Sequence, residues 1–280
     1  LVLFSALIIG CGGDNSSSAA PVIPEKCIWT IMYYGDADCN LESDLLEDVE
    51  EMKSGFVDGQ GVALVALFDR SASYSSDSTT FGANFSDTRM YRITHGTAAR
   101  ITGGTKFPEI TTNSAYEADM GDASTLKKFI EACKEQFPAD HYALILSNHG
   151  GGCKSVTRAF SSRVMKSAVS KSICWDESSS SDFLYTAEIS AALDSNDSVD
   201  LLGFDACLMS SVELAYQFRP GNGGFSASYI VACPPTETGD GWKYDNIFSR
   251  IRIGGGNSAE SDLTLGGSEK YYEPATMTAA

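Results

Sequence analysis

The sequence predicts an α/β fold in which a mostly parallel sheet is flanked by helices. Apolar, β-branched and aromatic runs alternate with segments whose apolar residues recur at helical spacing, which is the pattern of parallel strands joined by crossover helices. The runs are apolar throughout rather than at every second residue, as expected of strands buried on both faces. With 280 residues, of which 43% are hydrophobic, the chain can bury a sizeable core.

Five short apolar segments that end at turn residues are predicted to be strands. They are residues 27–34, 62–70, 141–147, 199–207 and 228–233. Residues 71–118 are rich in Ser and Thr with short alternating pieces, which predicts a hairpin excursion. Residues 153–182 are predicted to be a loop.

Two long segments are predicted to be helices. The first ends at Gly55 and carries apolar residues at helical spacing, namely Leu41, Leu45, Val49 and Met52. The second begins at Asp122 and is ended by Pro138. Shorter helices are expected at 186–195 and 208–218.

The N-terminal segment is predicted to be a targeting signal rather than part of the fold. Residues 1–10 form an apolar run that is too short to span a bilayer, and the run ends at Gly10-Cys11. This ending resembles a bacterial lipobox, in which the Cys becomes lipidated; an ordinary secretory signal with a chance Cys is the alternative. We expect a signal segment over 1–11 and a Gly/Ser/Pro tether over 12–25, followed by a catalytic domain over 26–252 and a tail over 253–280.

The charge balance excludes one class of partner. Lys and Arg number 20 against 37 Asp and Glu, a net charge of −17. Such a chain would be repelled by a phosphate backbone, so no nucleic-acid partner is expected. The same balance is compatible with a basic peptide.

The cysteines do not indicate a metal site. There are eight, and if Cys11 carries lipid an odd number remains, so at least one thiol has no disulfide partner. His149 and Cys153 lack a second pair of ligands at metal spacing, which argues against zinc. We therefore assign no metal ligands.

A histidine and a cysteine follow two of the predicted strands. His149 follows the third strand and precedes Gly150, and Cys207 ends the fourth. Since sites in open α/β sheets form at the carboxyl ends of strands, neighbouring strands would bring imidazole and thiol together. An imidazole that removes the thiol proton makes the sulfur a strong nucleophile. The N–H groups of Gly150 and of Cys207, expected at a helix N-terminus, could form an oxyanion hole.

Several motifs resemble those of the clostripain family of cysteine peptidases, relatives of caspases, gingipains and legumain. They spread over residues 27–250 and read WTIMYYGDADCNLES, ALILSNHGGG, LYTAEISAAL, LLGFDACLMSSVELAYQF and IVACPPTETGDGWKYDNIF. The resemblance implies a caspase-like α/β/α sandwich. It implies His149 as the catalytic base, Cys207 as the nucleophile and Gly150 as an oxyanion-hole residue. It also implies that Asp205 lines an S1 pocket for Arg or Lys, although a turn or helix-capping carboxylate is the alternative.

The sequence departs from the family pattern at two thiols. Cys39 stands in a turn that usually reads Ala-Asp-Asn-Asn, and Cys233 stands near the S1 wall where Ser is expected. Calcium dependence is known for the type member, but no D-x-D-x-D-G loop is present. No cofactor is expected to be required, and calcium is left without an assigned site.

A basic segment lies between the two predicted catalytic residues. Residues 153–173 contain five basic residues and no acidic one. A Ser-rich basic loop beside a site that prefers basic residues is a candidate for self-cleavage, with Arg163 as first choice because it lies mid-loop between small or extended neighbours. A solvated run of charge is the alternative.

The two reactive residues predict a cysteine hydrolase with a Cys–His dyad, and the resemblance implies an endopeptidase that cuts after Arg or Lys. We expect a monomer, anchored by lipid in a bacterial cell envelope and facing the periplasm or the exterior. Its partners would be peptides or proteins and the membrane. The alternatives are a hydrolase of different specificity and a catalytically inactive surface lipoprotein with the same fold.

Overall fold

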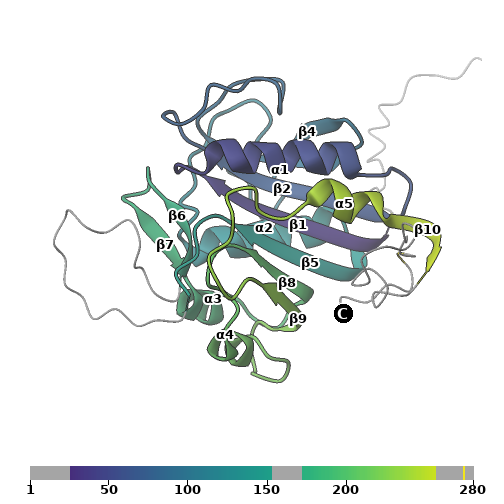
Figure 1. The fold of residues 1–280 in the computed structure, drawn as a ribbon, viewed down its shortest axis with the longest axis vertical. Helices are drawn as coiled ribbons and strands as arrows, with labels where there is room; N and C mark the ends of the chain where they lie inside the picture. The colour runs from purple at the N-terminus through teal and green to yellow at the C-terminus, as the bar shows by residue number, and fades with distance from the viewer. Residues whose placement is uncertain (1–25, 153–171, 257–273, 275–280) are drawn as a thin grey trace, which may run out of the picture.

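The computed structural model describes residues 26–152, 172–256 and 274. Within them a seven-stranded sheet has the order β4-β3-β2-β1-β5-β8-β9 (Figure 1). Five strands run parallel, and the hairpin β3–β4 adds an antiparallel edge. The strands are β1 Cys27–Ala37, β2 Val62–Arg70, β3 Thr88–Thr94, β4 Thr97–Ile101, β5 Ala139–Ser147, β8 Val199–Asp205 and β9 Ala227–Ala232.

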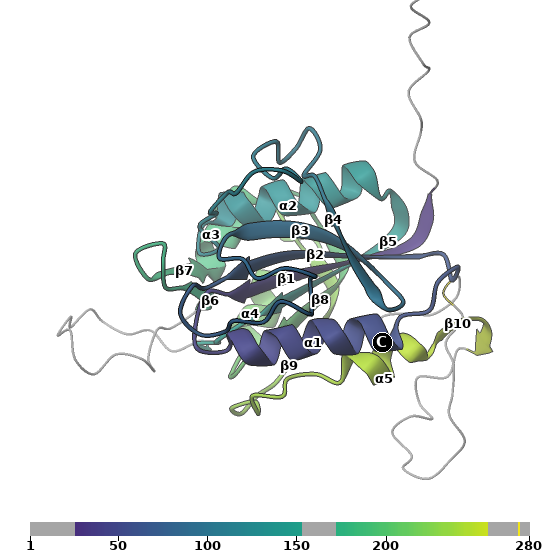
Figure 2. The ribbon, with the colours of Figure 1, turned by 90° about the horizontal axis from the view of Figure 1, so that it is seen from above.

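Helices cover both faces of this sheet, as Figure 2 shows. One face packs against α1 and α5, and the other against α2, α3 and α4, so each face has its own buried apolar cluster. The helices are α1 Glu42–Gly55, α2 Ala123–Gln136, α3 Thr186–Ala192, α4 Val212–Gln217 and α5 Tyr244–Ser249, and a last strand, β10, spans Ile251–Gly256. The predicted caspase-like α/β/α sandwich is confirmed.

The long helices begin and end as their sequences predict. The Asp122 side chain caps α2 by accepting a hydrogen bond from the Ser124 N–H, which satisfies one of the unpaired donors at a helix start. Gly55 is the last residue of α1, where an added Cβ would lie 2.4 Å from the Asp245 carbonyl oxygen. Close approach to α5 therefore requires glycine at this position.

Two local predictions are wrong. Residues 153–182 were expected to be loop throughout, but Ser172–Asp176 and Asp182–Tyr185 pair as the antiparallel strands β6 and β7. This hairpin lies beyond the carboxyl ends of β1 and β5 (Figure 1). The helix expected from residue 208 begins only at Val212, because Ser211 is its N-cap and Leu208 has a left-handed φ of 64°. Cys207 is therefore in a turn and not at a helix N-terminus.

Within the described residues, no helix is both long enough and apolar enough to cross a bilayer.

Candidate active site

The two predicted catalytic residues follow neighbouring strands. β5 and β8 pair in parallel, and their last register pair is Ser147 with Asp205. His149 and Cys207 each lie two residues beyond that pair. The prediction that these strands are neighbours is confirmed, and the imidazole and the thiol extend from the same edge of the sheet.

A buried amide holds the backbone around His149. The Asn148 side chain is 2% exposed, and its Nδ2 donates to the Asp36 carbonyl and to Cys39 Sγ. Its Oδ1 accepts from the Trp175 N–H at 3.0 Å. One side chain thus connects the end of β1, the β1–α1 loop and the β6–β7 hairpin at the residue before His149.

Asn40 contacts the imidazole and was not singled out by the sequence analysis. Its Oδ1 lies 3.0 Å from His149 Nε2. Since an amide oxygen only accepts hydrogen bonds, Nε2 carries the hydrogen of this contact, and Nδ1 is the basic nitrogen of the neutral ring. Asn40 stands one residue after Cys39 in the first motif, so position in that motif was the available signal.

Cys207 is half-buried beneath the chain that follows β9. The Glu237 N–H donates to Cys207 Sγ at 3.2 Å. The Leu208 N–H donates to the Pro235 carbonyl at 2.9 Å, so the 233–237 segment runs beside the turn that carries the thiol. The left-handed backbone at Leu208 costs energy for a residue with a side chain, and such strain is typical of functional turns.

Gly150 is packed against the backbone of Cys207. A Cβ at Gly150 would lie 2.2 Å from the Cys207 carbonyl oxygen, so no other residue fits without displacing the chain. Gly150 also forms an isolated antiparallel bridge with Ile173. The two backbones proposed for the oxyanion hole are therefore in contact.

Asp205 is the last residue of β8 and is 5% exposed. Its Oδ2 accepts from the Tyr244 hydroxyl at 2.8 Å and from the Trp242 N–H at 3.4 Å. Burial raises the pKa of this carboxyl, while the Tyr244 hydrogen bond lowers it. No Lys or Arg forms an ion pair with Asp205 in the part of the chain that the structure describes.

A second carboxyl, Asp48 on α1, lies behind Asp205. It accepts a hydrogen bond from the Tyr33 hydroxyl at 3.0 Å. Burial, followed by the charge of Asp205, raises the pKa of Asp48 to about 9, so this carboxyl keeps its proton at neutral pH. A buried carboxyl with hydrogen-bond donors but no cation, such as Asp205, suits a positively charged ligand side chain.

The sequence analysis assigned no metal ligands, yet three carboxyls converge beside this site. Oxygens of Asp38, Asp69 and Glu117 lie within 4.8 Å of one another. The three residues are far apart in sequence, and only the Asp-x-Asp at the end of β1 is a pattern that the sequence itself shows.

Cys11 and Arg163 lie outside the described residues. Among the described cysteines, which are Cys27, Cys39, Cys133, Cys174, Cys207 and Cys233, no disulfide links one to another.

The comparisons with known proteins agree with the geometry. A sequence model described as the Clostripain family matches residues 33–275. Clostripain of Hathewaya histolytica is 53% identical over 254 residues, which cover 89% of this chain and 47% of that protein. The chain thus spans about half the length of this relative.

Two solved structures share the fold. One is a secreted C11 cysteine protease from Bacteroides thetaiotaomicron in complex with an irreversible peptide inhibitor, with 20% identity, a TM-score of 0.54, and coverage of 79% of this chain and 52% of that one. The other is an inactive zymogen C11 protease from Parabacteroides distasonis, with 24% identity, a TM-score of 0.55, and coverage of 82% and 55%.

We predict that Asn40→Ala slows the reaction of Cys207 with iodoacetamide by about 10- to 100-fold, because a misplaced imidazole takes up the thiol proton poorly. Peptide-resolved mass spectrometry measures the rate for each thiol. Cys233, which is also half-buried, is the internal control and should react at the wild-type rate. Equal reaction rates of Cys207 in the wild type and the variant would show that Asn40 does not contribute to the reactivity of this thiol.

Proposed function

Because the chain belongs to the clostripain family, we propose that it is a cysteine endopeptidase that cleaves peptide bonds after Arg or Lys. The observation that carries this proposal is the pairing of β5 with β8, which puts His149 and Cys207 at equivalent places on adjacent strand ends. The contact between His149 Nε2 and Asn40 supports it further, because it orients the ring.

In the proposed reaction the Cys207 sulfur attacks the carbonyl carbon of the scissile bond after its proton passes to His149 Nδ1. The backbone N–H groups of Gly150 and Cys207 stabilise the negative charge on the carbonyl oxygen. When the C–N bond breaks, the imidazolium returns the proton to the leaving amine. Water then hydrolyses the thioester and releases the acid and the free thiol. These steps use only groups of the chain and water.

The specificity for a basic residue is proposed from Asp205. Its carboxyl is buried and accepts hydrogen bonds from Tyr244 and Trp242, which keeps the oxygens oriented. A guanidinium or ammonium group that reaches the Asp205 carboxyl would neutralise a charge whose burial is otherwise unfavourable. The proposed discrimination between basic and neutral residues therefore rests on the charge of this buried carboxyl.

Self-cleavage is proposed within the basic segment 153–173. The described residues on either side of 153–171 lie side by side, because Gly150 bridges Ile173 and the Gly151 N–H donates to the Ser172 carbonyl at 2.9 Å. Residues 172 and 173 belong to β6 and are paired there, so cleavage is expected at a residue before 172. In the sequence, Arg163 is near the middle of the stretch between Gly151 and Ser172.

We further propose that Cys11 carries a lipid that anchors the domain in a bacterial cell envelope. The apolar run before it is the support. Detergent partitioning of the chain expressed with this segment, compared with Cys11→Ser, tests the anchor; equal partitioning would refute it. Two alternatives to the proposed peptidase function are a hydrolase of different specificity and a catalytically inactive binding protein of the same fold.

Cys207→Ala and His149→Ala should each lower kcat/KM on an Arg-containing fluorogenic peptide by at least about 1,000-fold, because each removes an obligatory group of the dyad. Cys27→Ala, which removes a thiol at the opposite end of β1 from the site, should stay within a few-fold of wild type. Thermal unfolding controls for folding. Residual activity above a tenth of wild type in either dyad variant would refute the mechanism.

Asp205→Asn should lower kcat/KM for Arg and Lys substrates by about 2–4 kcal/mol in transition-state binding and affect neutral residues less. Glu213→Gln, an exposed change on α4, is the control. A uniform loss for all substrates would make Asp205 structural.

The same variant should be more stable at neutral pH. Burial raises the folded-state pKa of Asp205, so the ionised carboxyl opposes folding at any pH above its unfolded pKa. In the Cys207→Ala background, Asp205→Asn should therefore raise Tm at pH 7, and the difference should shrink as pH falls toward 4. A lower Tm at pH 7 would contradict this reasoning.

Wild-type protein should separate into two chains on a denaturing gel, with the smaller one beginning at Val164, whereas Cys207→Ala should stay intact. Arg163→Ala should slow the cut, and Arg219→Ala, an Arg outside the segment, should not. Cleavage of the Cys207→Ala protein, or a new N-terminus outside 154–172, would exclude self-cleavage here.

A further inference from the structure

A second thiol, that of Cys233, is carried by the chain that runs beside the turn of Cys207. The strands β8 and β9 pair in parallel, and their last register pair is Phe204 with Ala232. Cys207 and Cys233 therefore follow neighbouring strands at the same edge of the sheet. Beyond the strands the Ser210 N–H donates to the Cys233 carbonyl at 3.1 Å. The two thiols thus belong to segments of the chain that are in direct contact.

The Cys207 sulfur faces the segment that begins with Cys233. Cys207 Sγ accepts from the Glu237 N–H at 3.2 Å and lies 3.8 Å from the Glu237 carbonyl oxygen. Both thiols are half-buried, so small solutes in the solvent can reach them. Burial, followed by the charges of Glu237 and then of Cys207, raises the pKa of the Cys233 thiol, and a neighbouring charge acts in this way only at short range.

The segment that carries Cys233 can adjust to the geometry of a disulfide. Such a bond requires the two Cα atoms to lie within about 7 Å of each other. Residues 233–243 belong to no helix or strand, so a shift of Cys233 toward Cys207 breaks no hydrogen bond of a strand ladder or a helix. The contact between Cys207 Sγ and the Glu237 N–H would be lost as the sulfur turns toward Cys233.

No other thiol in the described part of the chain is placed to react with Cys207. Three of them are 0% exposed, namely Cys39, Cys133 and Cys174. Burial raises the pKa of each of these three, and buried thiols of this kind are unreactive. Cys27 is half-buried, but it begins β1, and the 11 residues of that strand extend over about 30 Å toward the site. Cys233 is therefore the described thiol that can meet the nucleophile.

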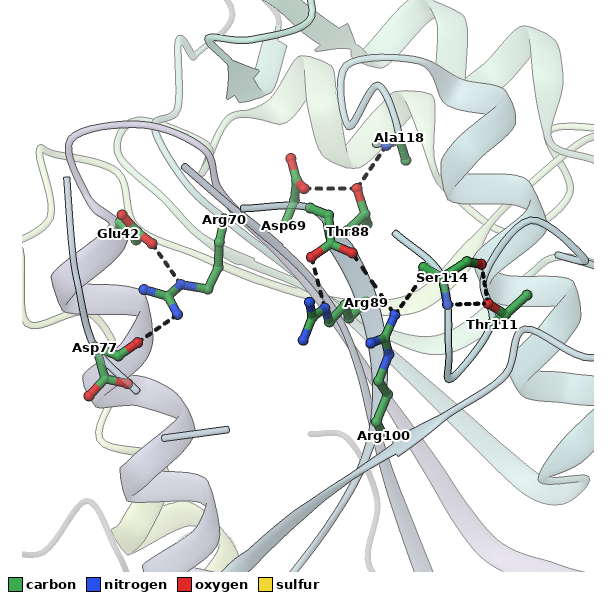
Figure 3. A network of polar contacts seen from close by, with 11 residues as sticks. Glu42, Asp69, Arg70, Asp77, Thr88, Arg89, Arg100, Thr111, Ser114 and Ala118 are labelled. Atoms are coloured by element: carbon green, nitrogen blue, oxygen red, sulfur yellow. Dashed lines mark hydrogen bonds and ion pairs between the residues drawn. The ribbon is translucent and has the colours of Figure 1, made fainter. Parts of the chain in front are cut away.

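The two thiols differ in how readily they lose a proton. Cys207 can pass its proton to His149 in the proposed dyad, whereas the raised pKa of Cys233 keeps that thiol protonated at neutral pH. The arginines labelled in Figure 3 belong to β2, β3 and β4, in the half of the sheet away from β9, and Arg70 forms an ion pair with Glu42 at 2.7 Å. These cations therefore do not stabilise a thiolate at Cys233. An oxidant should react first with Cys207.

We propose that Cys207 and Cys233 form a reversible disulfide when the protein meets a peroxide, so that the pair is a modification site for oxidants of this class. The Cys207 sulfur first attacks a peroxide oxygen. The S–O bond forms as the O–O bond breaks, and the second oxygen leaves as water with the thiol proton. The Cys233 sulfur then attacks the Cys207 sulfur, and the S–S bond forms as the S–O bond breaks, which releases a second water with the Cys233 proton. Two thiols are oxidised to one disulfide, and one hydrogen peroxide is reduced to two waters.

The disulfide blocks the nucleophile in a form that can be recovered. A sulfenic acid at Cys207 that meets no second thiol is oxidised further to the sulfinic acid, which small thiols do not reduce. Condensation with Cys233 stops the oxidation at the disulfide, and a small thiol reduces this bond by exchange. Formation of the bond does not depend on peptidase activity. Only the loss and recovery of activity rest on the proposed function.

The first test maps the disulfide in the full wild-type chain by mass spectrometry without reduction. The protein is reduced with dithiothreitol, freed of it, and treated with hydrogen peroxide at a concentration close to its own. A peptide pair that joins Cys207 to Cys233 should become the main oxidised product of Cys207, and dithiothreitol should remove it. A sulfinic acid as the main product at Cys207, or a link from Cys207 to any other cysteine or to a second molecule, would overturn the proposal.

The second test measures how much activity returns, each protein being compared with its own rate before peroxide. After inactivation by peroxide and then dithiothreitol, the wild type should recover at least about 80% of that rate, and Cys233→Ser less than about 20%, because its sulfenic acid meets no second thiol. Cys27→Ser removes a half-buried thiol at the far end of β1 and should recover as the wild type does. Equal recovery in the wild type and in Cys233→Ser would overturn the proposal. If Cys233→Ser does not fold, the peptide map of the wild type decides.

The two tests together separate this proposal from the proposed function. A chain that cleaves no peptide before peroxide, yet shows the link between Cys207 and Cys233 afterwards, would support the disulfide and count against the peptidase. Activity that is lost and recovered without that link would overturn the disulfide and leave the peptidase in place.

Discussion

The hydrogen bonds of the Asn148 side chain are the constraint on which the rest of the site depends. An amide can donate from one end and accept at the other, and Asn148 uses both ends to connect the end of β1, the β1–α1 loop and β6. All three partners are backbone or thiol groups that water reaches poorly, so losing this amide would leave polar groups unsatisfied at about 1–3 kcal/mol each. Because His149 is the next residue, the hydrogen bonds of Asn148 fix the position of its backbone, and the contact with Asn40 orients its ring.

The parts of the fold that the sequence predicts are those determined by local pattern. Continuous apolar runs identified the parallel strands, Asp122 identified the start of α2, and the rule that parallel strands end at one edge brought His149 toward Cys207. The parts that it missed depend on contacts across the chain. The β6–β7 hairpin pairs segments of only five and four residues, which are too short to show an alternating pattern, and the delayed start of α4 follows from the left-handed turn at Leu208. Neither has a periodic signal.

The same distinction applies within the site. His149 and Cys207 carry reactive groups and can be recognised as candidates from the sequence. Asn is a common surface residue, so Asn40 can be assigned to the site only from its distance to the His149 imidazole. Asp38 directly follows β1 and Asp69 is in β2, so their proximity follows from the predicted strands, whereas Glu117 comes from a connection whose course no sequence pattern specifies.

The bridge between Gly150 and Ile173 has a consequence for how the protein unfolds. It closes the chain between residues 150 and 173 into a loop, and the seven-stranded sheet takes β1 to β5 from before this loop and β8 and β9 from after it. A single break inside that loop leaves a sheet assembled from two separate polypeptides, since β5 and β8 still pair across the break. Folding then changes from a reaction of one molecule to a reaction of two. The stability of the cut protein would depend on its concentration, and at high dilution the two dissociated fragments would reassociate slowly.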